Sequence, residues 1–129
     1  TMIADGEGLA NNFTPFHTII SIFSDAITYH AYGTLCYQFF GNILLFIPLG
    51  FSLYCYFKED KKFVRMLCSV IAITVFVEIW QWVFNAMLQV NYRCVDVDDI
   101  ILNTIGGILG FCIASFGISM LKSFFGKNK

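Results

Sequence analysis

Three long apolar segments constrain this chain more than any other feature of its sequence. They run from about Leu35 to Phe57, from about Phe63 to Leu88, and from about Ile100 to Leu121. A helix needs roughly 20 apolar residues to cross the hydrocarbon core of a bilayer. The segments are apolar nearly all round, whereas the helices of a soluble bundle need polar outer faces. The sequence therefore predicts three transmembrane helices rather than a soluble three-helix core.

The composition agrees with a membrane protein. The chain has 129 residues, of which 57% are hydrophobic and 13% are charged, whereas soluble domains carry about 25% charged residues. The net charge of −1 gives no basic surface for a nucleic acid. We expect one all-α membrane domain over residues 1–129.

The charges between the apolar segments predict the orientation of the helices. Residues 58–65 and the tail from Lys122 are rich in lysine and arginine, whereas residues 89–98 hold one arginine against two aspartates, and a third aspartate follows at position 99. Cytoplasmic loops of membrane proteins carry an excess of Lys and Arg. We therefore expect 58–65 and the tail on the cytoplasmic side, and 89–98 on the outer side.

The N-terminal region predicts a fourth, shorter helix. Residues 13–31 are apolar but are interrupted by histidine, serine and aspartate, and Phe16, Ile20, Phe23 and Ile27 share one helical face. This pattern favours an interfacial or re-entrant amphipathic helix over a span.

Polar side chains form a stripe on the second apolar segment. Glu78, Asn85 and Gln89 lie near one line along the helix, with Gln81 beside them. The third segment has a face of small residues that includes Gly106, Gly110 and Gly117, where GxxxG spacing allows close approach of another helix. We expect the small face to pack against a neighbouring helix, and the outer end of the third segment to meet the polar stripe.

Several polar groups should converge in the outer half of the membrane, with Asp99 at the outer edge. Ionisable residues inside a membrane are costly and usually functional, and this makes Glu78 the central candidate, either protonated or paired with Arg93 or a cation. Two simpler interpretations stay open: the amides serve as hydrogen-bond links between helices, and Asp98 or Asp99 caps the third helix. The candidate ligand-binding residues are Asn42, Glu78, Gln81, Arg93, Asp96, Asp98, Asp99 and Asn103.

Four sequence pieces carry a resemblance to a known family. They are Asn-Phe-Thr-Pro-Phe at 12–16, Gly-Asn-Ile-Leu-Leu-Phe-Ile-Pro-Leu-Gly at 41–50, Glu-Ile-Trp-Gln at 78–81, and residues 93–107 from Arg-Cys-Val-Asp to Ile-Gly-Gly. In this order they resemble the VanZ-like membrane proteins of bacteria, named for a protein linked to teicoplanin resistance. The resemblance implies a multi-pass protein of the bacterial cytoplasmic membrane and a link to glycopeptide or lipoglycopeptide resistance. Because relatives often carry another hydrophobic segment before the Pro-Phe motif, and this sequence starts at Thr1, we expect a preceding segment outside it.

Three functional hypotheses follow. In the first, the protein binds an amphiphile such as a lipid-linked cell-wall intermediate, a polyprenyl phosphate or a lipoglycopeptide, and Arg93 pairs with a phosphate or carboxylate. In the second, it is a membrane enzyme in which Glu78 acts as general acid or base on a lipid headgroup. In the third, it is an accessory subunit whose polar cluster is purely structural.

We expect no resident cofactor, with one alternative. The alternative is a divalent cation at Asp96, Asp98 and Asp99, since carboxylate oxygens are hard ligands. The five cysteines are scattered without CxxC spacing, which disfavours zinc. A disulfide between Cys36 and Cys94 is chemically allowed on the outer side.

Overall fold

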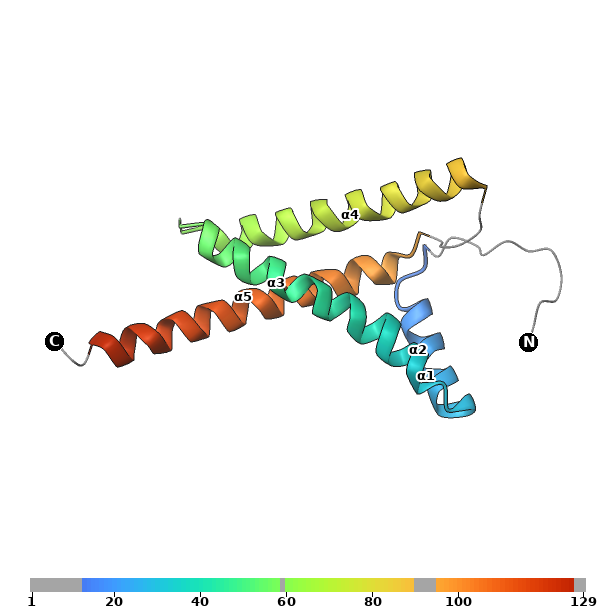
Figure 1. Cartoon of the computed structure of the whole chain (residues 1–129), viewed down its shortest axis with the longest axis horizontal. Helices are drawn as coiled ribbons and strands as arrows, with labels where there is room; N and C mark the ends of the chain where they lie inside the picture. The colour runs from blue at the N-terminus through green and yellow to red at the C-terminus, as the bar shows by residue number, and fades with distance from the viewer. Residues whose placement is uncertain (1–12, 59, 90–94, 127–129) are drawn as a thin grey trace.

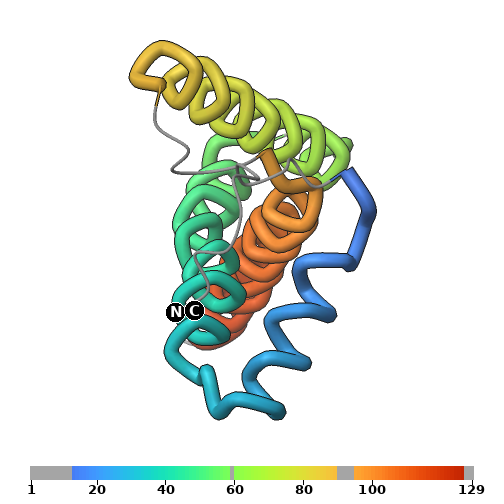
Figure 2. The backbone as a smooth tube through the Cα atoms, turned by 90° about the vertical axis from the view of Figure 1, so that its right-hand side faces the viewer, coloured from blue at the N-terminus to red at the C-terminus, as the bar shows by residue number. Residues whose placement is uncertain are grey.

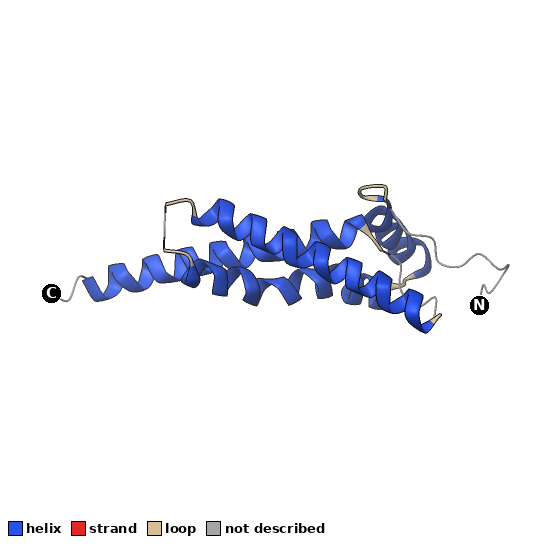
Figure 3. Ribbon diagram, turned by 90° about the horizontal axis from the view of Figure 1, so that it is seen from above, coloured by secondary structure: helices blue, strands red, loops and turns tan. Residues whose placement is uncertain are grey.

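A computed structural model describes residues 13–58, 60–89 and 95–126, and the regular structure in these ranges is helical. The chain order is α1 (His17–Tyr29), α2 (Tyr32–Thr34), the π-helical η1 (Leu35–Phe40), α3 (Gly41–Tyr56), α4 (Lys62–Leu88) and α5 (Val97–Gly126). Figure 3 shows that most of the described chain is helical.

Three helices are long and apolar enough to cross a membrane, as the sequence predicted. The first span is continuous through α2, η1 and α3, from Tyr32 to Tyr56, and the others are α4 and α5. The expected boundaries of the third span were too narrow, because α5 starts at Val97 rather than Ile100 and ends at Gly126 rather than Leu121. Its first turn includes Asp98 and Asp99, and carboxylates are favourable at a helix N-terminus.

α5 is the central helix of the molecule. Figure 1 shows α3 crossing α5, with α4 running alongside, and Figure 2 looks along the long axis, with α3 and α1 on opposite sides of α5. α1 lies at the end where α5 begins, and it contacts η1 and α5. This arrangement brings the start of α5 close to both α1 and the C-terminal half of α4.

Glycines bring the backbones of α3 and α5 together. A Cβ atom added at Gly106 or Gly110 would collide with the carbonyl oxygen of Ile43 or Ile47, and one added at Gly50 would collide with Gly107. The predicted small face of α5 therefore packs against α3, and small residues permit such close contact. Gly117 was wrongly included in this face, because nothing lies within 4 Å of a Cβ built there.

Apolar and aromatic side chains fill the space between α3, α4 and the middle of α5. Phe46, Met66, Val70 and Phe111 form the buried cluster. The Phe111 ring makes edge contacts with the rings of Tyr54 and Phe63, whose centroids lie 5.0 and 5.4 Å away, while the Lys62 ammonium lies 3.9 Å from the centre of the Tyr54 ring.

α1 forms a helical hairpin with the first span. Its chain reverses at His30, where φ is 55°, and the rings of Phe23 and Phe39 meet edge to face at 5.1 Å. Ile22 and Ala26 are buried, whereas Phe16, Ile20 and Ile27 of the apolar face recognised in the sequence are more than half exposed. Phe23, the fourth residue of that face, packs on the first span, so the rest of the face is left open, as expected for a helix that meets lipid.

Candidate functional site

Asp96 caps the start of α5. Its Oδ1 accepts a hydrogen bond from the backbone N–H of Asp98 at 2.9 Å, which is the geometry of an N-cap residue one position before Val97. The alternative interpretation in which Asp98 or Asp99 caps this helix is therefore excluded, because α5 begins earlier than the apolar run suggested.

Asp98 holds the start of α1 instead. Its side chain is fully buried, and it accepts hydrogen bonds from the backbone N–H groups of Phe16 and, at 3.0 Å, Ile19. α1 has no capping side chain of its own, and Phe16 has a left-handed φ of 65°. One carboxylate from α5 therefore satisfies two N–H groups that a helix start leaves without backbone partners.

Asp99 links α5 to the first span. The Asn42 amide donates a hydrogen bond of 2.6 Å to Asp99 Oδ1. Both side chains are partly buried. This contact joins two of the predicted site residues, which lie 57 positions apart in the chain.

Glu78 lies on the buried face of α4. That face is Met66, Val70, Thr74 and Glu78, one residue every turn. The Glu78 side chain is only 3% exposed, and its Oε2 accepts a long hydrogen bond, 3.4 Å, from the backbone N–H of Asp96. Farther along the predicted stripe, Gln81 and Asn85 are half-buried, and Gln89 is exposed beyond the end of α4.

Asn103 pairs with Thr74 deep between α4 and α5. Its Nδ2 donates to Thr74 Oγ1 at 2.6 Å, while its Oδ1 is buried without a hydrogen-bond partner. Exchanging the amide O and N would leave the other end of the amide lacking a partner, so the deficit does not depend on that assignment. Thr74 was missed by the sequence analysis, although it lies one turn from Glu78 on the same face.

The Asn103–Thr74 contact sets the level of Asn103 along α4. Thr74 lies next to the midpoint of α4, so Asn103 is level with the middle of that helix. Asp99 and Asp98 lie about 6–8 Å from this level along α5, toward its start, at 1.5 Å per residue. The depth expected for Asp99 in the membrane stays a prediction.

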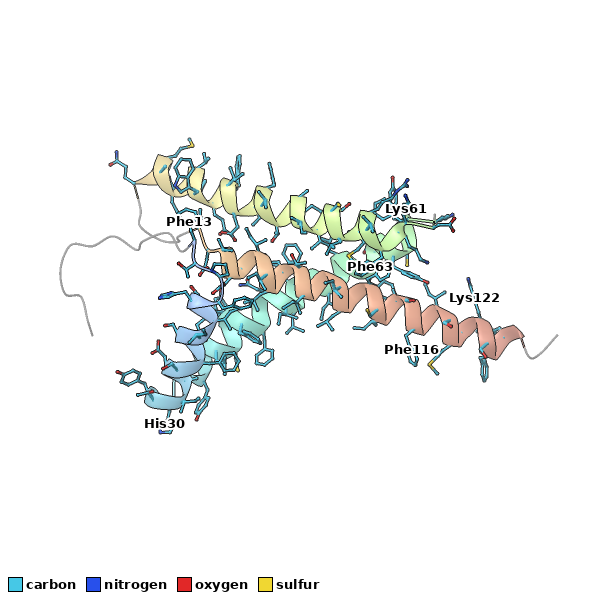
Figure 4. The ribbon with its side chains drawn as sticks, turned by 180° about the vertical axis from the view of Figure 1, so that it is seen from behind. Phe13, His30, Lys61, Phe63, Phe116 and Lys122 are labelled. Carbon is cyan, nitrogen blue, oxygen red and sulfur yellow. The ribbon has the colours of Figure 1, made fainter. Side chains whose placement is uncertain are left out.

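An apolar groove opens beside the acidic groups. It has a volume of about 230 Å³ and is lined by Phe13, Ile79, Trp82 and Val95. Ile79 and Val95 directly adjoin Glu78 and Asp96 in the chain. Figure 4 shows Phe13 at the end of the molecule where α5 begins.

Some expectations fall outside the described residues. These include every statement about Arg93 and the pairing of Cys36 with Cys94. Within residues 13–58, 60–89 and 95–126, no group of three His, Cys, Asp or Glu side chains is placed to hold a metal ion.

The comparison with protein families gives a clear result. A family model described as VanZ/LLP1 matches residues 2–120, which is most of the chain. The chain belongs to the VanZ/LLP1 family. The comparisons with curated proteins and with solved structures found no match. The match to VanZ/LLP1 spans α1 to α4 and most of α5, so it includes every residue of the candidate site.

Proposed function

We propose that this VanZ/LLP1 protein binds an amphiphile within the membrane. The polar head contacts the groups around Glu78 and Asp96, and the apolar part occupies the groove lined by Phe13, Ile79, Trp82 and Val95. A lipid-linked cell-wall intermediate, a polyprenyl phosphate or a lipoglycopeptide has this combination of head and tail. The expected setting is the bacterial cytoplasmic membrane, and the expected consequence is altered resistance to glycopeptide or lipoglycopeptide antibiotics.

The observation that carries the proposal is a buried carboxylate next to an apolar groove. Glu78 is almost fully buried and its Oε2 lies 3.4 Å from the backbone nitrogen of Asp96, while the neighbouring residues Ile79 and Val95 line the groove. Small-molecule sites are typically apolar concavities with a few converging polar groups. The unsatisfied oxygen of Asn103 one turn deeper supports the same conclusion, because a buried acceptor without a donor needs an explanation such as a bound water or ligand.

The charges of the described residues favour particular headgroups. Glu78, Asp96, Asp98 and Asp99 are all acidic, so a head that brings an amine or a bridging divalent cation fits better than a simple anion. In this proposal Glu78 is the central group and Arg93 is the contact for a phosphate or carboxylate. Gln81, Asn42 and Asn103 complete the polar wall.

The test compares Glu78→Gln with a matched control, Asp25→Asn, which changes an exposed carboxylate on α1. Proteins in nanodiscs are titrated with a fluorescent lipoglycopeptide and with lipid-linked cell-wall intermediates, with Mg²⁺ or with a chelator. We expect at least about a tenfold loss of affinity for Glu78→Gln, equal to about 1.4 kcal/mol, and none for the control. Unchanged binding in Glu78→Gln, Arg93→Ala and Asp99→Asn would favour the accessory-subunit hypothesis, whereas a modified headgroup on recovered lipid would favour the enzyme.

A second variant tests the groove separately from the acid. Ile79→Trp enlarges an exposed side chain in the groove wall, so it should block the tail while the bundle stays folded. Val64→Trp, at an exposed apolar position on the same helix but away from the groove, is the control. Equal affinity in the two variants would rule out the groove as the tail site.

The orientation of the site has its own test. We expect a cysteine replacing Lys61 to be protected from a membrane-impermeant reagent in intact cells, and a cysteine replacing Asn91 to react, because of the lysine and arginine distribution. Labelling at position 61 would place the site on the opposite side.

A further inference from the structure

α4 and α5 run antiparallel but overlap along only part of their lengths. At one end of the overlap the ring of Phe63 contacts that of Phe111, and at the other the N–H of Asp96 contacts Glu78. Fifteen residues separate Phe63 from Glu78, and fifteen separate Asp96 from Phe111. At 1.5 Å per residue the overlap is about 22 Å long. α5 then continues for another fifteen residues, from Phe111 to Gly126, or about 22 Å.

The cations at the start of α4 show where the membrane border lies. Lys61, Lys62 and Arg65 surround the first turn of α4, and cations are costly inside hydrocarbon. Because Phe111 is level with Phe63, we place the point where α5 leaves the hydrocarbon between Phe111 and Phe116, which gives the span up to about 20 residues from Val97. Figure 4 shows α5 continuing past the labelled Lys61 and Phe63, with Lys122 on the continuing part. We call Phe116–Gly126 the α5 extension.

The α5 extension is amphipathic and exposed. Phe116, Met120, Leu121, Phe124 and Phe125 are all more than half exposed. At 100° per residue, these side chains and Ile118 cover an arc of about 200°. The remaining arc of about 100° holds Ser119, Lys122, Ser123 and Gly126.

We propose that the α5 extension is a membrane-surface helix that binds anionic phospholipid headgroups at the basic end of the bundle. An apolar arc opposite a lysine-bearing polar stripe is the pattern of a helix that lies in the membrane interface. Charge complementarity favours anionic lipid, because Lys61, Lys62, Arg65 and Lys122 are gathered at this end. α5 is one continuous helix through this region, and on the membrane we expect it to bend at Gly117, where no neighbouring atom lies within 4 Å of a Cβ built there and glycine tolerates a kink. Such a bend would turn Phe124 toward the acyl chains and keep Lys122 at the headgroups.

The first test uses the natural sequence. Hydrogen exchange of residues 116–126 is compared in nanodiscs of phosphatidylcholine alone and of phosphatidylcholine with one quarter phosphatidylglycerol. We expect at least fivefold slower exchange in the anionic nanodiscs, and loss of that difference in Lys122→Gln. Lys58→Gln, which lies in the connection before α4, is the matched control and should retain the difference. Free inorganic phosphate should not reproduce the protection; if it does so in neutral nanodiscs, the site takes phosphate rather than lipid and the proposal fails.

The second test identifies what covers the apolar arc. Single spin labels are placed at Met120 or Phe124 on the apolar arc, and at Ser119 or Ser123 on the polar stripe. The background is a cysteine-free protein whose elution profile and helix content match those of the wild type. We expect labels at 120 and 124 to collide mainly with oxygen, which partitions into lipid, and labels at 119 and 123 mainly with a water-soluble nickel chelate. Four equally nickel-accessible positions would mean that the extension stands in water. If labels at 120 and 124 are inaccessible to both oxygen and the nickel chelate and show dipolar coupling between copies, a second copy of the chain covers the apolar arc.

Discussion

α5 meets α3 and α4 in two different ways. Against α3 it presents glycines, and the two backbones touch without intervening side chains along an extensive interface. Against α4 its N-terminal half presents Asn103, which contacts Thr74, and the segment leading into it presents Asp96, which contacts Glu78. The α3 interface is therefore built for tight packing, whereas the part of the α4 interface near the start of α5 contains polar groups that packing alone does not require.

The difference separates structure from candidate function. In a membrane, close packing of small residues holds helices together, and interhelical hydrogen bonds add little. Two helices can associate without a buried acid or an amide oxygen that lacks a donor, and burying such groups costs free energy. We therefore assign stability mainly to the glycine interface and ligand contact to the polar one, and three predictions test that division.

The largest expected effect is at the glycine interface. Gly110→Leu would drive a side chain into the carbonyl of Ile47, and we expect it to cost about 3 kcal/mol or more and to prevent folding. Gly117→Leu is the matched control on the same helix, because its position is open, and it should stay near wild type. Thermal unfolding in detergent, monitored through the elution profile, distinguishes the Gly110→Leu and Gly117→Leu variants. Comparable stability of the two variants would mean that the backbones of α3 and α5 are not in contact.

An intermediate effect is expected at the link between α5 and α1. Asp98→Ala removes the carboxylate that holds the N–H groups of Phe16 and Ile19, and losing a helix cap costs about 1–2 kcal/mol. Amide exchange at residues 16–20 should accelerate about tenfold while exchange in α4 stays unchanged. The exposed Asp25→Ala on α1 provides the comparison. If exchange at these residues does not change, Asp98 is not the cap of α1.

The smallest effect on stability is expected at Asn103. Asn103→Leu removes a hydrogen bond worth about 0.6 kcal/mol, but it also removes a buried acceptor without a donor, so unfolding free energy should change by less than about 1 kcal/mol. Thr74→Val should destabilise more, by about 1–2 kcal/mol, because it leaves both ends of the amide without partners. A loss above about 3 kcal/mol in Asn103→Leu would make this interface as structural as the glycine one.

The sequence by itself determined the class of the protein and most of its elements. Three apolar runs require three spans because backbone groups in hydrocarbon must bond within their own helix. Glycine spacing identified the packing face of α5 at Gly106 and Gly110, and the polar stripe on α4 indicated that Glu78 faces a neighbouring helix rather than lipid. These features are periodic, so they can be deduced from a single helix.

The tertiary structure alone decided the partner of each polar group. Nothing along the chain indicates that Asp98 caps a helix 79 to 82 residues away, or that Asp99 meets Asn42. The contact of Asp99 with Asn42 depends on the lengthwise offset between α3 and α5, where Gly106 lies on Ile43 and Gly110 on Ile47. The contact of Asp96 with Glu78 depends in the same way on the offset between α4 and α5, at whose other end Phe63 packs on Phe111. A hydropathy pattern gives the length of each span, but the offset between two spans is a property of their contact.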